Sequence, residues 1–336
     1  GTESPPQIAI PGKVTDSGGT PVEGAQVVLY QIVPEEGGSA SRYQAVDEKT
    51  TGADGTYTLM VPQGGEPPRP SSGYVGARKP GLALGWESWR AQVHARVDLV
   101  LAEAKDLAGE VVDENGQPVA GAEVRIMAAM AGNIPGRRYL ASPAFLRATT
   151  DGGGRFVFAD MPVGTTFEFT VEKPGRATVE TLDRLLSTSD GFQFAPGQVG
   201  IKLVSPTEAR IEGLVVQQGD GRPVGGVRVT ARASARMGSL MSPRTATSAA
   251  DGAFHLGGLL AGSYALMATT PAGQTDEWVA EPVEVVLKAG ETQRDVKLQL
   301  SKGALIEVLV KDDTGQPVER ANVSVYSTLY NQGSSG

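Results

Sequence analysis

The chain has 336 residues, no cysteine and a formal net charge of -8, with 44 glycines, 22 prolines and 6% aromatic residues. The lack of cysteine excludes disulfides, thiol catalysis and cysteine-ligated metals, and the acidic charge argues against nucleic acid as a partner. Glycine and proline favour short strands joined by tight turns, and every apolar run is far shorter than the ~20 residues of a membrane helix. We therefore expect an all-β protein in which no segment inserts into a membrane.

Four segments of the chain repeat one pattern at intervals of ~100 residues, which is the size of a domain and not of a solenoid unit. The copies are GKVTDSGGTPVEGAQVVLY from Gly12, GEVVDENGQPVAGAEVRIM from Gly109, GLVVQQGDGRPVGGVRVTA from Gly213 and EVLVKDDTGQPVERANVSVY from Glu307. In each copy we expect a strand, a tight turn and a second strand. Asp and Gly favour the turn, and the proline that follows suits the beginning of a strand or an edge.

The second strand of each copy alternates apolar and mostly polar residues, which predicts that one face packs against a core. The residues expected to face the core are Ala25, Val27, Leu29; Ala122, Val124, Ile126; Val227, Val229, Ala231; and Ala321, Val323, Val325. Gly24, Gly121 and Gly226 precede the first three of these strands and indicate a bulge or a close backbone contact. Because Arg320 replaces this glycine in the last copy, glycine is not strictly required there.

A second pattern follows each of the first three copies, and a closing strand then ends each unit. The segments of the second pattern are TTGADGTYTLMV from Thr50, TTDGGGRFVFADMPVG from Thr149 and TSAADGAFHLGGLLAG from Thr247. The repeats predict three complete modules, residues 1–104, 105–206 and 207–303, each with its own core. Residues 304–336 hold only the opening hairpin of a fourth module, which we expect to be truncated and to have an unpaired edge.

The two patterns together, G-x-V-x-D-x-x-G-x-P-V-x-G-A-x-V and T-x-x-D-G-x-F-x-L, resemble the carboxypeptidase regulatory-like domain. This family is related to the collagen-adhesin B-type repeat within the prealbumin-like, transthyretin-like superfold. The resemblance covers nearly the whole chain and implies tandem seven-stranded Greek-key β-sandwiches. It says little about activity, because such modules accompany peptidases, surface receptors, adhesins and secreted bacterial proteins.

The sequence has no catalytic, cofactor-binding or metal-binding motif. Its two histidines, His94 and His255, belong to no HExxH or comparable ligand pair, and we interpret His255 as a strand-surface residue. A G-x-S-x-G elbow, a P-loop and a G-x-G-x-x-G after a strand are also absent. We therefore predict that the chain is not an enzyme and binds no cofactor or metal.

The resemblance to adhesins raises one covalent possibility. Such relatives can carry an isopeptide bond from a lysine to an asparagine or aspartate between their first and last strands, catalysed by a buried acid. Lys13 and Asp98 lie on the corresponding strands of the first module, but the sequence offers no convincing buried glutamate to complete the set. We interpret Lys13 as facing solvent.

Aromatic residues are candidates for a ligand site, because related sandwiches bind sugars on exposed rings. The candidate residues are Tyr74, Trp86, Trp89 and Trp278. The alternative is that these large side chains fill the core or pack at an edge, since aromatic residues dominate burial in small domains.

The insertions between the second and third strands, residues 31–49, 127–148 and 232–246, are expected at one end of every module, where binding loops usually lie. The group within them that looks most suited to binding a partner is Arg137, Arg138, Tyr139 and Phe145. Its alternative role is a loop that packs on its own sheet or on the next module.

The leading functional hypothesis is a non-catalytic structural and interaction array, acting as a spacer or docking surface in a larger bacterial protein. We expect this protein to be extracellular, at the cell surface or periplasmic. The alternatives are carbohydrate-binding or adhesin modules, and an accessory region of a secreted peptidase. A protein or a glycan is the expected partner, and we expect a monomer in which the edge of the fourth module is available for association.

Overall fold

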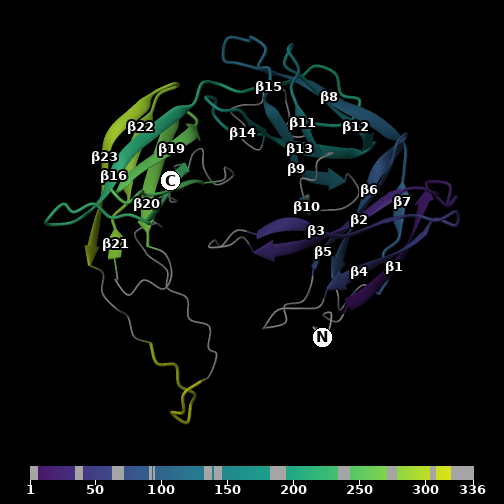
Figure 1. Cartoon of the computed structure of the whole chain (residues 1–336), viewed down its shortest axis with the longest axis horizontal. Coiled ribbons are helices and arrows are strands. Elements are labelled where there is room, and N and C mark those ends of the chain that lie inside the picture. The colour runs from purple at the N-terminus through teal and green to yellow at the C-terminus, as the bar shows by residue number, and fades with distance from the viewer. Residues whose placement is uncertain are drawn as a thin grey trace. The chain divides into compact units, whose positions relative to one another are not determined.

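A computed structural model describes residues 7–34, 41–62, 72–90, 93, 95–131, 138–139, 146–181, 194–233, 243–270, 278–302 and 308–318. The regular elements of these residues are β-strands (Figure 1), which confirms the predicted all-β class. Within the same ranges, no helix is long and apolar enough to cross a membrane. The chain forms two compact units, Gly1–Pro206 and Thr207–Gly336.

The first unit begins with a sandwich of a three-stranded and a four-stranded sheet, which we call the first sandwich. Its smaller sheet has the order β4 (Thr56–Pro62), β1 (Gln7–Asp16), β7 (Leu99–Leu101). Its larger sheet has the order β3 (Ser41–Thr50), β2 (Gln26–Pro34), β5 (Ser72–Lys79), β6 (Leu82–Arg90). Apolar side chains from both sheets, including Ile10, Leu29 and Leu59, form one buried cluster between them.

The second sandwich lies in the same unit and repeats this arrangement. Its smaller sheet has the order β12 (Arg155–Pro162), β8 (Ala104–Val112), β15 (Ile201–Val204). Its larger sheet has the order β10 (Arg138–Tyr139), β9 (Glu123–Ala131), β13 (Thr165–Glu172), β14 (Val179–Glu180), with β11 (Arg147–Thr149) also on β9. The core of this sandwich is rich in phenylalanine, namely Phe156, Phe158, Phe167, Phe169 and Phe194.

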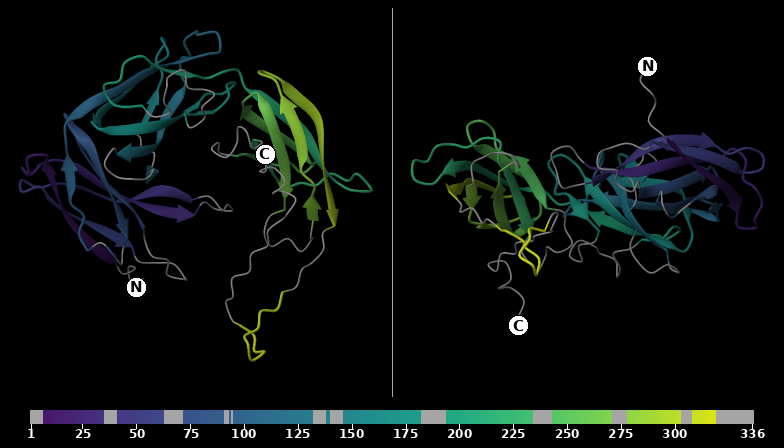
Figure 2. Two further views of the ribbon diagram at one scale, coloured as in Figure 1. Left: turned by 180° about the vertical axis from the view of Figure 1, so that it is seen from behind. Right: turned by 90° about the horizontal axis from the view of Figure 1, so that it is seen from below.

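The third sandwich, drawn in green to yellow-green in Figure 2, lies in the second unit and consists of two four-stranded sheets. One sheet has the order β19 (Ala253–Leu259), β16 (Ala209–Gln217), β23 (Thr292–Lys302), β21 (Trp278–Ala280). The other has the order β18 (Arg244–Thr247), β17 (Arg228–Ala233), β20 (Gly262–Thr269), β22 (Val283–Leu287). A separate buried cluster fills the space between these sheets.

The predicted alternation in the second strand is confirmed for the second and third copies, whereas in the first copy Val28, on the face opposite the core residues, is also buried. Every residue expected to face the core in these three copies is at most 1% exposed, whereas the intervening Gln26, Glu123 and Arg228 reach solvent. Ala321, Val323 and Val325 of the last copy lie outside the described residues. The module boundaries drawn from the repeats remain a prediction.

The closing strand of each sandwich pairs in parallel with the first strand, as in β1 with β7, β8 with β15 and β16 with β23. This pairing accounts for the glycine that opens each repeat. At Gly213 an added Cβ would lie 2.2 Å from the carbonyl oxygen of Val296 and 2.7 Å from the ring of Phe254. Gly12 and Gly109 have equivalent neighbours. In every sandwich, the ring of the motif aromatic residue therefore fills the space that a side chain at the motif glycine would need.

A buried hydroxyl holds the two repeat patterns together. Thr150 Oγ1 donates to the carbonyl of Val119 at 2.7 Å and accepts from the amide of Ala122 at 2.8 Å. Thr51 and Ser248 make the same pair of bonds in the first and third sandwiches. The initial Thr or Ser of the second pattern thus satisfies backbone groups that burial would otherwise leave unpaired.

Gly24, Gly121 and Gly226 adopt φ of 70°, 68° and 77° with open space around them, so the close-contact alternative is wrong. The bulge alternative is supported, because the amide of Gly121 donates to the carbonyl of Thr150 and the amide of Thr150 donates to the carbonyl of Ala122, so that two residues oppose one. The first supposed insertion, residues 31–49, is largely strand, because β2 continues to Pro34 and β3 begins at Ser41.

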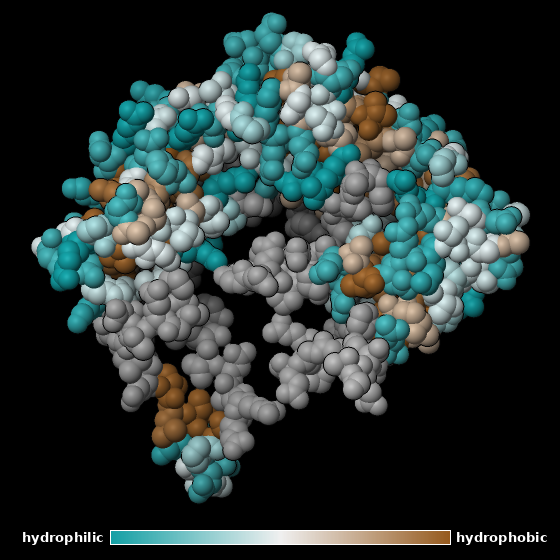
Figure 3. Space-filling model, viewed as in Figure 1, coloured by the Kyte–Doolittle hydropathy of each residue, from teal (hydrophilic) through white to brown (hydrophobic). Residues whose placement is uncertain are grey.

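In the fourth copy, the structure describes a hairpin at residues 308–318, which is the yellow segment in Figure 1. Lys311 bridges to Pro317, and the carboxylate of Asp312 accepts the amides of Thr314 and Gln316 at 2.9 Å. Val308 and Leu309 are 56% and 69% exposed, and this segment carries hydrophobic (brown) surface in Figure 3.

Candidate functional site

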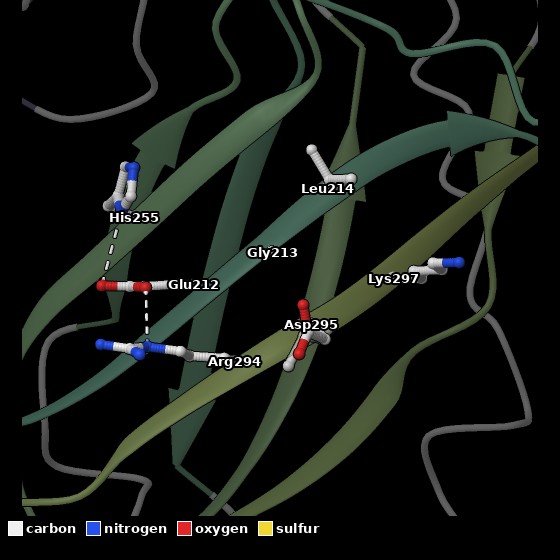
Figure 4. Close-up of a pocket in the computed structure, with 8 residues that line it drawn as sticks. Glu212, Gly213, Leu214, His255, Arg294, Asp295 and Lys297 are labelled. Atoms are coloured by element: carbon white, nitrogen blue, oxygen red, sulfur yellow. Dashed lines mark ion pairs between the residues drawn. The ribbon is translucent and has the colours of Figure 1, made fainter.

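The candidate site is a hollow of about 210 Å³ on the outer face of β16, β19 and β23 in the third sandwich (Figure 4). The backbone of Gly213 contributes to its floor, while a Cβ at this position would point away from the hollow into the core, towards the ring of Phe254. The hollow is therefore bordered by the side chains of the neighbouring positions, Glu212 and Leu214 on β16 and His255 on β19.

A β-bulge in β23 shapes one wall of the hollow. The register of β23 on β16 shifts between Gln293 and Val296, so that Arg294 and Asp295 together oppose Glu212. Asp295 has a φ of 59°, a left-handed conformation that aspartate tolerates better than most residues. The bulge directs both charged side chains to the outer face, which is a common use of such irregularities beside sites.

Glu212 lies at the centre of the charged groups (Figure 4). Its carboxylate is 3.3 Å from Arg294 Nε and 3.9 Å from His255 Nδ1. The side chains of Arg294 and His255 are 70% and 75% exposed, so water and a partner both have access to them. Exposed pairs of this kind contribute little to stability, which leaves them free to exchange partners.

Lys297 connects this hollow with a second one of about 290 Å³ further along β23. The second hollow is lined by Gln218, Glu281, Gln299 and Ser301 together with Pro282 and Val283. Alternate residues of β23 thus present a line of polar groups across the outer face. The arrangement is suited to hydrogen bonding and ion pairing with a polar partner.

The described residues contain no group of three or more His, Cys, Asp and Glu side chains able to hold a metal ion. The predicted strand-surface position of His255 agrees with its exposure on β19. His94 lies outside the described residues.

The aromatic candidates are mostly covered by protein. Tyr74 is 7% exposed and Trp89 is 1% exposed, so neither ring has a face open for a sugar in this structure. Trp86 is half-buried, with its ring centroid 6.3 Å from that of Phe167 in the second sandwich. Trp278, on β21, packs partly buried against the third core. These positions correspond to the alternative of core filling and edge packing.

The remaining candidates are only partly described. Arg138 and Tyr139 form the short strand β10, whose backbone pairs with Ala128 and Ala129, and Arg137 and Phe145 lie outside the described residues.

The Lys13–Asp98 pair of the adhesin resemblance is held by other bonds. The carboxylate of Asp98 accepts the backbone amide of Lys13 at 2.8 Å and the guanidinium of Arg96 at 2.9 Å. The hydrogen bond from Arg96 is the main reason that the pKa of Asp98 lies below its usual value. A stabilised, ionised carboxylate of this kind is a poor acceptor for amide formation, which requires loss of a carboxyl oxygen.

Sequence inspection missed Glu212, Arg294 and Lys297. Glu212 and Arg294 are brought together only by the parallel pairing of the first and last strands and by the bulge in β23. The closing strand was recognisable from its apolar alternation. Its register was not, because a bulge changes which residues share a face without changing the pattern on either side.

The fold and the site define a class of protein, the tandem array of β-sandwich modules. Within this class, the chain belongs to the carboxypeptidase regulatory-like domain family, whose model matches residues 106–198 and 210–301 and so covers more than half of the chain. The resemblance seen in the repeats is thereby confirmed. No curated protein matches the chain.

Solved structures of similar chains have low identity. The Bacillus anthracis TIE protein is 16% identical over 88% of this chain and 51% of that chain, with a TM-score of 0.23. A streptococcal ancillary pilin is 14% identical over 88% and 99%, with a TM-score of 0.29. BcpA, the major pilin subunit of Bacillus cereus, is 11% identical over 89% and 100%, with a TM-score of 0.25. The chain spans about half of the TIE protein, and these scores carry no functional argument.

Proposed function

We propose that the chain is a non-catalytic array of β-sandwich modules that serves as a spacer and docking surface in a larger secreted or cell-surface protein. The family match supports this role, because the matched model describes a regulatory-like domain. The single observation that carries the proposal is the parallel pairing of the first and last strands in all three sandwiches.

Parallel pairing places the two ends of each module at opposite ends of the strand pair. The chain runs into β16 at Ala209 and leaves β23 at Lys302, and both strands point the same way. At ~3.3 Å per residue, a strand of this length separates the two ends by roughly 30 Å. Each sandwich therefore adds its full length to an array, which is what a spacer requires.

The same geometry favours resistance to tension. When the two chain ends are pulled apart, β16 and β23 are loaded along their length, so that several hydrogen bonds must break together. If the same strands were pulled apart from one end, the bonds would break one after another. The proposal therefore predicts that resistance depends on the direction of pulling.

Single-molecule force measurements can test this with introduced cysteines, because the chain has none of its own. In the third sandwich, Arg210→Cys with Lys302→Cys loads β16 and β23 along their length. Arg210→Cys with Thr292→Cys loads the same strands from one end, since Arg210 and Thr292 are register partners. Arg210→Cys is common to both variants, so the loss of the Arg210 side chain affects both rupture forces equally. We expect a clearly higher rupture force for the first pair, whereas equal forces would contradict a load-bearing role.

The docking part of the proposal is supported by the hollow around Glu212, which offers charged and polar groups on a rigid sheet. A protein surface of mixed charge is the partner that this chemistry fits best. The carbohydrate alternative has less support, because Tyr74 and Trp89 are buried.

A further inference from the structure

Strand β6 of the first sandwich has side chains directed to two different cores. Leu82 packs against the core of its own sandwich, whereas Leu84 is a member of the buried cluster of the second sandwich and is 8% exposed. Residues two apart in a regular strand would share one face. Here the register on β5 shifts between Ala77 and Lys79, which leaves one extra residue in β6 and turns Leu84 to the opposite side.

Trp86 continues the same apolar contact along β6. Its ring packs against Phe167 of the second core and also borders a small cluster of Val28, Tyr30 and Tyr74 on the outer face of the first sandwich. Tyr30 and Tyr74 lie with their ring centroids 5.0 Å apart, and both are 7% exposed. A sheet face that would normally meet water is therefore apolar and covered.

A polar contact accompanies this packing. Asp160, in the bulge of β12 between Phe158 and Met161, has a φ of 57°, and its carboxylate accepts the amide of Gly81 at 3.2 Å. Gly81 belongs to the turn that leads into β6. Few residues other than glycine adopt the left-handed region, and the contact with Gly81 helps to hold Asp160 in it.

The residues that connect the two sandwiches are also held. Ala102 accepts the amide of Ala83 at 3.1 Å, and Glu103 accepts the amide of Val163 at 3.4 Å, before β8 begins at Ala104. The connection therefore has no free length in which the second sandwich could turn away from β6.

We infer that β6 is a shared strand, which completes the core of the second sandwich and makes the stability of that sandwich depend on the first. The third sandwich has a buried cluster drawn from its own strands and is independent of this contact. The inference goes beyond the proposed function and holds whether or not the array bears load.

Hydrogen exchange on the full chain tests the inference with two variants of one strand. Leu84→Ala removes a side chain from the second core, and Leu82→Ala removes one from the first. In Leu84→Ala we expect amides of β12 and β13 to exchange about tenfold faster or more, with a smaller change in β1. In Leu82→Ala we expect the larger change in β1, so the order of the effects is reversed.

Two controls accompany the pair. Val157→Ala alters a 54% exposed side chain on β12 and should leave exchange in the second sandwich unchanged. Amides of β16 and β19 in the third sandwich should be unchanged in every variant. The inference is overturned if Leu84→Ala leaves β12 and β13 as protected as in the parent chain, or if both leucine variants affect β1 most.

Discussion

In the second sandwich, Val157, Ala108 and Val199 occupy the places on the outer face that His255, Glu212 and Arg294 occupy in the third. Val157 opposes Ala108 just as His255 opposes Glu212. Val199 lies two residues before Ile201, which pairs with Gly109. Arg294 likewise lies two residues before Val296, which pairs with Gly213. Val157 and Val199 are 54% and 90% exposed, so these three places are apolar in one sandwich and charged in the other, while the charged pair on this face of the second sandwich, Glu110 with Lys202, lies beside them.

The frame beneath these faces is the same in both sandwiches. Gly109 and Gly213 are each crowded by a phenylalanine ring and by the closing strand, and Thr150 and Ser248 make equivalent buried bonds. The repeat motif therefore specifies the backbone, whereas the outer face can change its chemistry at little structural cost. Variants of the frame should therefore affect both sandwiches alike.

The largest expected effect comes from the motif glycines. In Gly213→Ala the new Cβ would lie 2.2 Å from the carbonyl of Val296, and in Gly109→Ala it would lie 2.9 Å from the carbonyl of Ile201. We expect each variant to lose about 3 kcal/mol of unfolding free energy, with the larger loss at Gly213. Urea denaturation measures the loss. Gly152→Ala, which has no atom within 4 Å, should change it by less than about 0.5 kcal/mol.

A smaller effect is expected at the buried hydroxyls. Thr150→Val and Ser248→Ala each leave a buried carbonyl and a buried amide without their partner, which costs about 1–3 kcal/mol. Equilibrium unfolding should show similar losses in both. Thr149→Val, at an exposed neighbouring position, is the control. A marked loss in only one sandwich would mean that the two frames are not equivalent.

The smallest effect is expected at the acidic turns. The amide of Gln117 is the main cause that lowers the pKa of Asp113, and the amide of Arg222 has the same effect on Asp220. Because the folded pKa lies below the ordinary 3.8, each carboxylate stabilises the fold above that pH and loses its contribution as the pH falls further. Thermal unfolding in acid should show that the melting temperatures of Asp113→Asn and Asp220→Asn fall less steeply with decreasing pH than that of the parent chain. An unchanged decline in both would contradict this account.

The repeating elements were predictable because their causes are local. Alternation at Val124 and Ile126, the Asp-Gly turns and the motif glycines each act within a few residues. The position of Trp89 was not predictable, since only the packing of the sandwich decides whether a strand aromatic is buried. The face to which Leu84 points depends on the bulge in β6, and the proximity of Glu212 to Arg294 depends on the bulge in β23. Neither bulge changes the residue pattern on either side of it.

The pairing of the first strand with the last has a consequence for biosynthesis. Contacts such as that between Lys13 and Asp98 span 85 residues, so the first sandwich cannot close until nearly all of it has emerged from the ribosome. Leu84 would stay uncovered for longer still, until β12 and β13 have followed. The first half of the chain thus passes through a stage in which a chaperone has apolar surface to bind, whereas the third sandwich can close as soon as β23 arrives.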